Sequence, residues 1–548
     1  MKKIACIFLI FALITAFIPG CEPKNKSGAQ ELKSKQSVMN EYGWEVPEET
    51  IEITYYGGKD NPEWVKRSTE RIHKYIFEKF NVRINKIVYD AEMDEILNLM
   101  LASGDYPEVI AGMYPDDAAL WVKLGKAIEL SPYIEEYGQN IKNKMGKYLD
   151  RLRDENGNLY MLAVEWGMLP IADYAVQLRW DWYKEIGSPE FSTPDEYYEV
   201  LKKMTEKHPL NMNGEKVYAL GVYKNSNIIR TLGGVWGLKD GWKEDEDHNL
   251  TFWTNTQEGL EMAKYLNRFY REGLMDPDSF VNTYDDWCAK CINERYAGFI
   301  GSWWVTGTNG HEAWQKIKGP EWNDDMRFVH FSIKAPDAET AYTNPKNTLG
   351  WGRTIITDKC EQPANIVKWW NFEISDLGNK LISWGIPNEE YSAWNYDGES
   401  WSWNEKQKST IINQEYFDWE TFYMLGSTAY WMVMGKGYNS DGTSVWFDQN
   451  FREESKWFKF RDENLKDTIF DFSEYYAIVY SPDDPITIKK QQVDNIINSE
   501  FAKAVMAKTE KECEKIFMDL REKVNKMGLG DIEDFVTGEY KENMEAWN

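Results

Sequence analysis

The most informative segment of the chain is residues 178–209, LRWDWYKEIGSPEFSTPDEYYEVLKKMTEKHP. Its second half predicts a helix with a complete N-terminal signal. Thr193 can cap the helix, Pro194 suits its first position, and Glu196 completes an S/T-x-x-E capping box. Apolar residues then recur at helical spacing: Tyr197, Val200, Leu201 and Met204. This spacing predicts a helix that covers a larger structure with its apolar face.

The residues before this helix follow a pattern of Arg179, Asp181 and Trp182, with a short amphipathic turn that ends at Gly187. Together with the capped helix, the pattern closely resembles the extracellular solute-binding proteins of bacterial carbohydrate ABC importers. In that family the segment opens the second lobe of a two-lobed protein that closes about a hinge. The resemblance implies an α/β protein with the two-lobed, periplasmic-binding-protein-like (type II) fold.

Further matches to this family are spread over nearly the whole chain, so the resemblance is to a full-length architecture. They are SGDYPEVIAG (103–112), IELSPYIEEY (128–137), RDENGNLYMLAVEW (153–166), the end of the helical pattern at 256–277, and KVNKMGLGDIEDF (523–535). Glu108 stands where the family usually has Asp. No internal repeat stands out.

The region after residue 50 alternates between strand and helix patterns. The predicted order is a strand at 51–56, a helix at 62–80, a strand at 82–88, a helix at 92–102 and a strand at 107–111. Such alternation is typical of a parallel sheet with helices on its faces.

The resemblance also implies how the 548 residues are divided, since a chain of this length exceeds one ordinary core. We expect the chain to cross between lobes near residues 164 and 349. The expected parts are a signal peptide (1–20), a flexible tether (21–49), the first part of lobe 1 (50–164), the first part of lobe 2 (165–348), a return to lobe 1 (349–398), and a mainly helical portion that completes lobe 2 and the hinge region (399–548).

The N-terminus predicts export. Two lysines precede an apolar run of 15 residues at 4–18, which is short for a membrane span and typical of a secretory signal. The run ends in Ile-Pro-Gly-Cys, which resembles a lipobox and makes Cys21 the expected lipidation site, although Pro19 replaces the usual small residue. An ordinary thiol at Cys21 is the alternative. The polar stretch after it predicts a disordered tether that holds the protein at the extracellular face of the membrane.

Composition narrows the class of ligand. The net charge of −27 argues against binding to nucleic acid or to an anionic lipid surface, so membrane contact is expected through the lipid anchor only. The chain has 26 Trp, 32 Tyr and 24 Phe, more indole than a core needs for filling. Aromatic rings with a flat apolar face and a polar edge suit sugars, although burial is the default use of any single ring.

Motifs for catalysis or cofactors are not found. The five histidines lack zinc spacing, and no P-loop, G-x-S-x-G or dinucleotide motif occurs, so we expect no cofactor, no metal and no enzyme activity. Cys288 and Cys291 form a C-x-x-C, which we interpret as buried packing in preference to redox chemistry. The acidic run at 244–247 lacks the register of a calcium loop and is interpreted as a solvated loop.

Candidate ligand-binding residues follow predicted strands, a glycine-rich loop or crossings between lobes, because ligands in open α/β sheets bind outside the carboxyl ends of strands. They are Lys59, Asp60, Tyr114, Trp166, Trp236, Trp303, Trp304, Trp351 and Arg353. Asp60 and Arg353 are expected to bind hydroxyl or carboxylate groups, and the Trp faces to stack on sugar rings. At each position packing is the competing interpretation. The pair Trp303 and Trp304 is the strongest candidate, because adjacent rings in a loop rarely both point into one core.

These observations predict the substrate-binding lipoprotein of an ABC importer, a monomer that captures a sugar or oligosaccharide and delivers it to a membrane permease. A ligand that contains uronate is included in this prediction. Three alternatives remain open, namely a peptide-binding importer component, a secreted carbohydrate-active enzyme and a surface adhesin.

Overall fold

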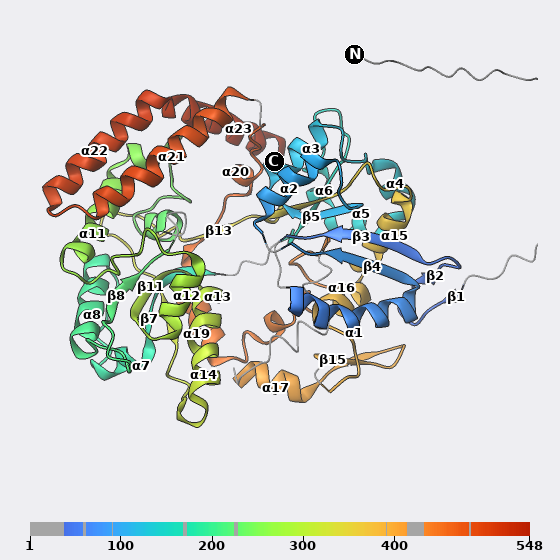
Figure 1. Ribbon diagram of the computed structural model, residues 1–548, viewed down its shortest axis with the longest axis horizontal. Coiled ribbons are helices and arrows are strands. Elements are labelled where there is room, and N and C mark those ends of the chain that lie inside the picture. The colour runs from blue at the N-terminus through green and yellow to red at the C-terminus, as the bar shows by residue number, and fades with distance from the viewer. Residues whose placement is uncertain are drawn as a thin grey trace, which may run out of the picture.

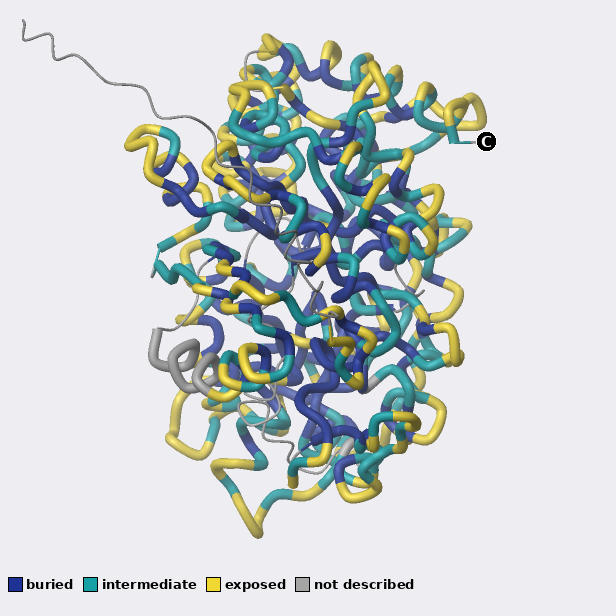
Figure 2. Tube along the Cα trace, turned by 90° about the vertical axis from the view of Figure 1, so that its right-hand side faces the viewer, coloured by how far each residue is buried: buried dark blue, intermediate teal, exposed yellow. Residues whose placement is uncertain are grey.

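The computed structural model describes residues 38–547 apart from 59–61, 90, 168–171, 224–227, 391, 414–431 and 482–483. The predicted signal peptide, Cys21 and most of the predicted tether lie outside the described residues. The described chain forms two lobes that lie side by side (Figure 1). Buried segments run through the interior, and exposed positions gather on outer loops and outer helix faces (Figure 2). Within the described part of the chain, every helix is too short or too polar to span a bilayer.

Lobe 1 is built on a five-stranded sheet in the order β4-β3-β5-β14-β6. Its strands are β3 (Ile51–Tyr56), β4 (Val82–Ile87), β5 (Val109–Met113), β6 (Leu162–Val164) and β14 (Gly352–Ile356). The parallel alternation predicted for residues 51–111 is confirmed for β3, β4 and β5. β14 runs antiparallel to β5 and β6, because the chain re-enters lobe 1 at the edge where the parallel strands end.

Helices cover both faces of this sheet. They are α1 (Pro62–Phe80), α2 (Met93–Ser103), α3 (Pro115–Lys123), α4 (Ser131–Tyr137), α5 (Gln139–Met145), α6 (Lys147–Asp150), α15 (Pro363–Glu373), α16 (Asp376–Trp384) and α17 (Glu405–Asn413). Side chains of a strand alternate between faces. Thus Ile53 and Tyr55 belong to the larger core with α15 and α16, whereas Tyr56 and Ile110 pack with α2 and α3 on the other face.

Lobe 2 is built on a four-stranded sheet in the order β12-β7-β11-β8. Its strands are β7 (Tyr174–Arg179), β8 (Tyr218–Gly221), β11 (Tyr296–Ser302) and β12 (Phe328–Phe331). β11 pairs parallel to β8 and antiparallel to β7. One face is covered by α8 (Pro194–Lys207), α11 (Gln257–Arg271) and C-terminal helices. The other face packs with α12 (Tyr284–Ile292) and α14 (Ala313–Lys318).

The segment 178–209 folds as its sequence predicts. It runs from β7 through α7 (Trp180–Glu185) into α8, whose N-terminus has the complete capping box between Thr193 and Glu196. Tyr197 is fully buried and donates from its hydroxyl to the Gln177 carbonyl at 2.7 Å. The apolar face of α8 therefore packs directly on the sheet, as expected of a covering helix.

The chain passes between the lobes at three places, and the first of these connections includes residues 168–171, which lie outside the described part. The chain leaves β6 of lobe 1 for β7 of lobe 2, and returns from β12 through β13 (Asn344–Lys346) to β14. It crosses a third time between η6 (Asp448–Phe451) and α19 (Lys456–Leu465), which packs on β12. β13 pairs parallel with β17 (Ile469–Asp471) beside these connections. The lobes are therefore joined by segments from three separate parts of the chain.

The C-terminal portion adds three long helices, α21 (Pro485–Val505), α22 (Glu510–Met527) and α23 (Leu529–Trp547). They pack on the core of lobe 2. Gly528, with φ +107°, adopts the left-handed conformation that ends α22. The end of α23 lies against lobe 1, where the Arg151 guanidinium is 3.9 Å from the Trp547 ring centroid.

Candidate ligand-binding site

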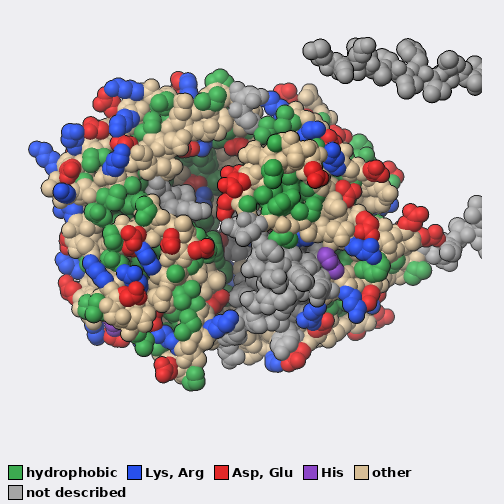
Figure 3. Space-filling model, in the orientation of Figure 1, with side chains coloured by type: hydrophobic (Ala, Val, Ile, Leu, Met, Phe, Trp, Pro, Cys, Tyr) green, Lys and Arg blue, Asp and Glu red, His purple; other side chains and the backbone are tan. Residues whose placement is uncertain are grey.

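Two sheet edges face each other across the space between the lobes. On lobe 1, the edge consists of the carboxyl ends of β3, β4 and β5 and the start of β14. On lobe 2, it consists of the carboxyl ends of β8, β11 and β12 and the start of β7. The connections between lobes leave from these edges, and Figure 3 shows the surface hollowed between the two lobes. We call this hollow the interlobe cleft; it is where open α/β sheets bind ligands.

On the lobe 1 edge, the structure brings Tyr114 and Trp351 onto neighbouring strands. Tyr114 follows β5 directly and is 63% exposed, and Trp351 precedes β14 and is 47% exposed. Met113 lies opposite Arg353 across the two strands, which sets the two aromatic residues at the same edge. Gly112 leaves room for the indole, since a Cβ there would lie 3.0 Å from Trp351 Cη2. These two rings form the exposed aromatic surface of this edge.

Arg353 supports the turn that carries Trp351. Its side chain is almost fully buried, and Nη1 donates to the carbonyls of Leu349 and Gly352, each at 3.1 Å. Burial lowers the pKa of Arg353 to about 10, so the guanidinium remains charged near neutral pH. Arg353 therefore positions the turn, and the hydrogen bonds from Nη1 are made to the backbone.

On the lobe 2 edge, Trp303 and Trp304 begin α13 (Trp303–Thr306) directly after β11 and contact different neighbours. Trp303 is half-buried, and its Nε1 donates to Asp173 Oδ1 at 2.8 Å. Arg461 lies 4.9 Å from the Trp303 ring centroid. Trp304 is 48% exposed, and its ring lies 6.2 Å from Tyr284. Trp304 is thus the more accessible ring of the pair.

The remaining predicted residues divide into two groups. Trp166 is buried and donates from Nε1 to the Val433 carbonyl at 2.9 Å, and Trp236 packs edge-on against Tyr265 of α11. Both rings are engaged in packing within their lobes. Lys59 and Asp60 lie outside the described residues.

Sequence reasoning missed an acidic group on the lobe 1 edge. Asp116 and Asp117 lie in the first turn of α3, just after β5, and Asp94 lies in the first turn of α2, the helix that follows β4. Burial raises the pKa of Asp117, and the charges of Asp116 and Asp94 raise it further. The sequence signal that could have identified these residues is an acidic residue in the first turn of a helix that follows a strand. Tyr114 was selected by its similar position after a strand.

Other candidate chemistry lies away from the cleft or is structural. Cys288 and Cys291 are both buried free thiols, which confirms the prediction of packing. Asp245 in the acidic loop accepts backbone N–H bonds from Asp247 and Asn249, as in a solvated turn. Among the described residues, no three His, Cys, Asp or Glu side chains are grouped so that they could hold a metal ion.

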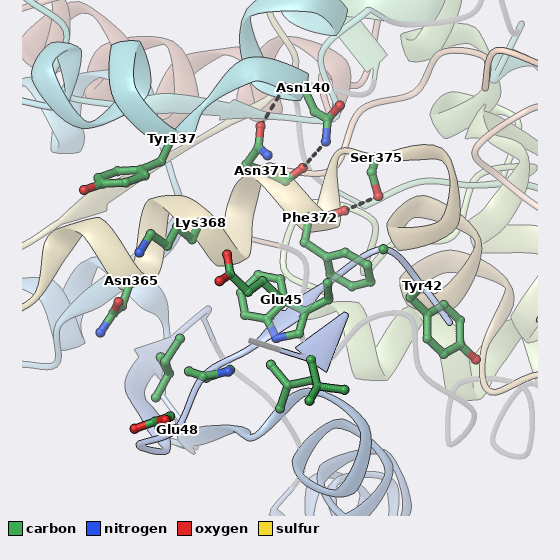
Figure 4. Close-up of a pocket in the computed structure, with 16 residues that line it drawn as sticks. Tyr42, Glu45, Glu48, Tyr137, Asn140, Asn365, Lys368, Asn371, Phe372 and Ser375 are labelled. Atoms are coloured by element: carbon green, nitrogen blue, oxygen red, sulfur yellow. Dashed lines mark hydrogen bonds between the residues drawn. The ribbon is translucent and has the colours of Figure 1, made fainter. Parts of the chain in front are cut away.

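A separate cavity of about 770 Å³ lies on the side of lobe 1 away from the cleft (Figure 4). It is bounded by the hairpin of β1 (Val38–Met39) and β2 (Glu45–Val46) and by α15. Asn140 Nδ2 donates to the Asn371 carbonyl at 3.0 Å on its wall. None of the seven predicted binding residues that the structure describes lines this cavity.

Comparison with known proteins gives three related sequences, and no family model matches. The chain is 25% identical over 331 residues to lipoprotein LipO of Bacillus subtilis (strain 168), covering 55% of this chain and 63% of LipO. It is 27% identical over 197 residues to the polygalacturonan/rhamnogalacturonan-binding protein YtcQ of the same organism, covering 35% of this chain and 38% of YtcQ. It is 23% identical over 403 residues to the fructooligosaccharide ABC transporter substrate-binding protein FusA of Streptococcus pneumoniae serotype 4 (strain ATCC BAA-334 / TIGR4). This match covers 68% of this chain and 69% of FusA. The chain thus spans less than two thirds of LipO and YtcQ.

Solved structures of similar shape cover nearly the whole chain. The alginate-binding protein AlgQ2 matches with a TM-score of 0.68 at 16% identity, over 91% of this chain and 99% of AlgQ2. FusA of S. pneumoniae in complex with fructo-nystose matches with a TM-score of 0.69 at 16% identity, over 90% of this chain and all of FusA. At this identity the likeness concerns the fold, which is the two-lobed solute-binding fold predicted from sequence.

Proposed function

We propose that this chain, a homologue of the substrate-binding proteins of carbohydrate ABC transporters, captures a sugar or oligosaccharide in the interlobe cleft and delivers it to a membrane permease. LipO, YtcQ and FusA support this proposal as relatives, and two of them are named for carbohydrates. The structure supports it through the placement of exposed aromatic rings.

The observation that carries the proposal is that Tyr114, Trp351 and Trp304 are exposed at the two facing sheet edges. Large aromatic side chains lose favourable burial when they face water, so their exposure at a concave site points to a ligand. Sugar rings present apolar C–H faces to such rings and hydroxyl groups to polar neighbours. A ligand that touches both edges would contact both lobes at once.

The mechanism that follows is a shift between open and closed populations. A sugar that bridges the two edges stabilises the closed form by the contacts that only this form provides. The permease then recognises the closed form. The chain makes no covalent change to its ligand, and we propose that it is not an enzyme.

The proposal extends to location and assembly. Lipidation at Cys21 would hold the protein at the extracellular face of the membrane, and the polar residues after it would act as the tether. The protein would act as a monomer beside its permease. Metabolic labelling with a fatty acid, with Cys21→Ser as the comparison, tests the anchor.

Isothermal titration calorimetry against a panel of oligosaccharides and peptides tests the binding function. Trp351→Ala, Trp304→Ala and Tyr114→Ala should each weaken sugar binding by about tenfold, which corresponds to about 1.4 kcal/mol. Phe77→Ala is the matched control, because Phe77 is an exposed aromatic residue near the end of α1, at the opposite edge of the lobe 1 sheet. A protein that binds only peptides, or that releases product from a sugar, would overturn the proposal.

A further inference from the structure

Two contacts join the lobes outside the segments that connect them. The Arg151 guanidinium of lobe 1 lies 3.9 Å from the ring centroid of Trp547, the last residue of α23. Asp116 Oδ1, in the first turn of α3, accepts the backbone N–H of Tyr480 at 2.9 Å. In Figure 1 the C-terminal helices extend from lobe 2 toward the upper part of lobe 1, above the space between the lobes. These contacts bridge the two lobes.

The lobe 2 side of both contacts is anchored in the core of that lobe. Val536 and Tyr540 of α23 are buried in this core. Tyr480 is buried in the same core, and its ring centroid lies 5.6 Å from that of Phe535, also on α23. Trp547 and Tyr480 are therefore fixed to lobe 2.

The lobe 1 side is anchored equally well. Arg151 directly follows α6, whose Leu149 is buried in the larger core of lobe 1. Asp116 belongs to α3, whose Trp121 is buried on the other face of the sheet. Asp116 lies two positions after Tyr114, so its contact with lobe 2 is made at the edge that faces the cleft.

Contacts between two rigid bodies depend on the angle between them. A rotation that opens the cleft moves the lobe 1 edge away from lobe 2, which lengthens the hydrogen bond between Asp116 and Tyr480. The contact between Arg151 and Trp547 has the same dependence, because each partner is fixed to its own lobe. An interaction that only one arrangement of the lobes provides raises the population of that arrangement, with or without a ligand.

We propose that Arg151 with Trp547, and Asp116 with the Tyr480 backbone, form an interlobe latch that favours the closed form before a ligand arrives. A protein that is competent to bind for only a fraction of the time binds its ligand more weakly by that fraction. The latch raises the fraction, so it increases affinity without touching the ligand. Its effect on affinity rests on the proposed function, whereas its effect on the shape of the free protein does not.

Small-angle X-ray scattering and calorimetry test the latch together. Arg151→Ala and Trp547→Ala should each enlarge the radius of gyration of the ligand-free protein and weaken sugar binding by about threefold, the size expected of a partly exposed cation–π pair. Trp547→Tyr should restore most of the parent behaviour, because it retains an aromatic face for the guanidinium. The double variant should lose no more affinity than either single variant, because one substitution already removes the pair.

Arg83→Ala is the matched control. The Arg83 guanidinium lies 4.8 Å from the Phe77 ring centroid, and both residues belong to lobe 1. This substitution removes a cation–π contact within one lobe, so the radius of gyration and the sugar affinity should stay those of the parent. Thermal unfolding confirms that each variant is folded.

The two measurements separate the possible outcomes. A radius of gyration that neither Arg151→Ala nor Trp547→Ala changes would overturn the latch. Weaker sugar binding with unchanged scattering would also overturn it, and would indicate that Arg151 or Trp547 contacts the ligand. If no sugar binds the parent, the proposed function fails, and the scattering of the free protein still tests the latch.

Discussion

Arg179 donates from Nε to Asp181 Oδ1 at 2.9 Å and from Nη2 to Oδ2 at 2.6 Å, so the two side chains form a two-pronged ion pair inside lobe 2. Nη1 of Arg179 donates to Glu294 Oε2 at 2.9 Å. The guanidinium lies between two indoles, 4.4 Å from the Trp182 centroid and 4.1 Å from the Trp314 centroid. Arg179, Asp181 and Trp182, which carry the family resemblance, therefore stabilise the interior of lobe 2.

Arg179→Met should destabilise the protein by about 3 kcal/mol, because removal of one partner leaves buried carboxylates unpaired. Urea unfolding gives this loss, and sugar affinity at a temperature where the variant is folded should match that of the parent. Lys526→Met is the control, since it removes an exposed ion pair with Glu522 that is worth less than about 1 kcal/mol. A folded Arg179 variant that has lost sugar binding would contradict this structural role.

Gly112→Ala should weaken sugar binding by about fivefold. The new Cβ would lie 3.0 Å from Trp351 Cη2 and would push the indole out of place. Gly125→Ala is the control, because Gly125 has a similar φ of +67° but nothing within 4 Å of the added Cβ. Both variants should lose about 1 kcal/mol of stability through backbone strain. Calorimetry that finds equal affinity in the two variants would remove Trp351 from the contact surface.

Arg353→Lys should weaken sugar binding because it loosens the turn that positions Trp351. Lysine retains the charge but cannot reproduce the geometry in which Arg353 Nη1 reaches the carbonyls of Leu349 and Gly352. A double-mutant cycle with Trp351→Ala tests this route. If Arg353 acts by positioning Trp351, its substitution should cost little further affinity once the ring is absent. Additive losses would instead indicate direct contact with the ligand.

Glu373→Gln should stabilise lobe 1 at pH 7. Glu373 is buried, Oε1 accepts from Trp369 Nε1 at 2.9 Å, and burial raises its pKa well above the ordinary value. A carboxyl with a raised pKa in the folded chain stabilises most below its unfolded pKa of about 4.3 and loses this contribution as pH rises. The variant should therefore be more stable than the parent at pH 7, because the amide has no charge to bury.

Urea unfolding midpoints of the parent and of Glu373→Gln, measured from pH 4.5 to 8, test the direction of this pH dependence. The advantage of Glu373→Gln over the parent should grow as pH rises. Glu361→Gln is the control, because Glu361 is exposed just before the same helix and its substitution should leave the midpoint unchanged across the range. A parent protein that becomes more stable relative to Glu373→Gln at higher pH would show that the carboxylate is stabilised when charged.

Local sequence determined the elements and carries the family resemblance. The capping box at Thr193 and the apolar spacing after it set α8, and the alternation over residues 51–111 set three parallel strands, because caps and periodicity act between near neighbours. The strand-end rule also selected Tyr114 and Trp304 among the candidates, and the predicted crossing between lobes selected Trp351. Sequence could not separate these from Trp166 and Trp236, because exposure depends on what packs against each ring.

Only the tertiary structure decided which residues share the cleft. Asp94 and Asp117 are 23 positions apart in sequence, and they become neighbours because β4 and β5 both flank β3 and end at one edge. The turn at Trp351 lies at the same sheet edge, because the chain comes back from lobe 2 and β14 pairs with β5. Tyr114 and Trp351 are brought together by strand pairing over a long loop of chain, a non-local event that no spacing in sequence records.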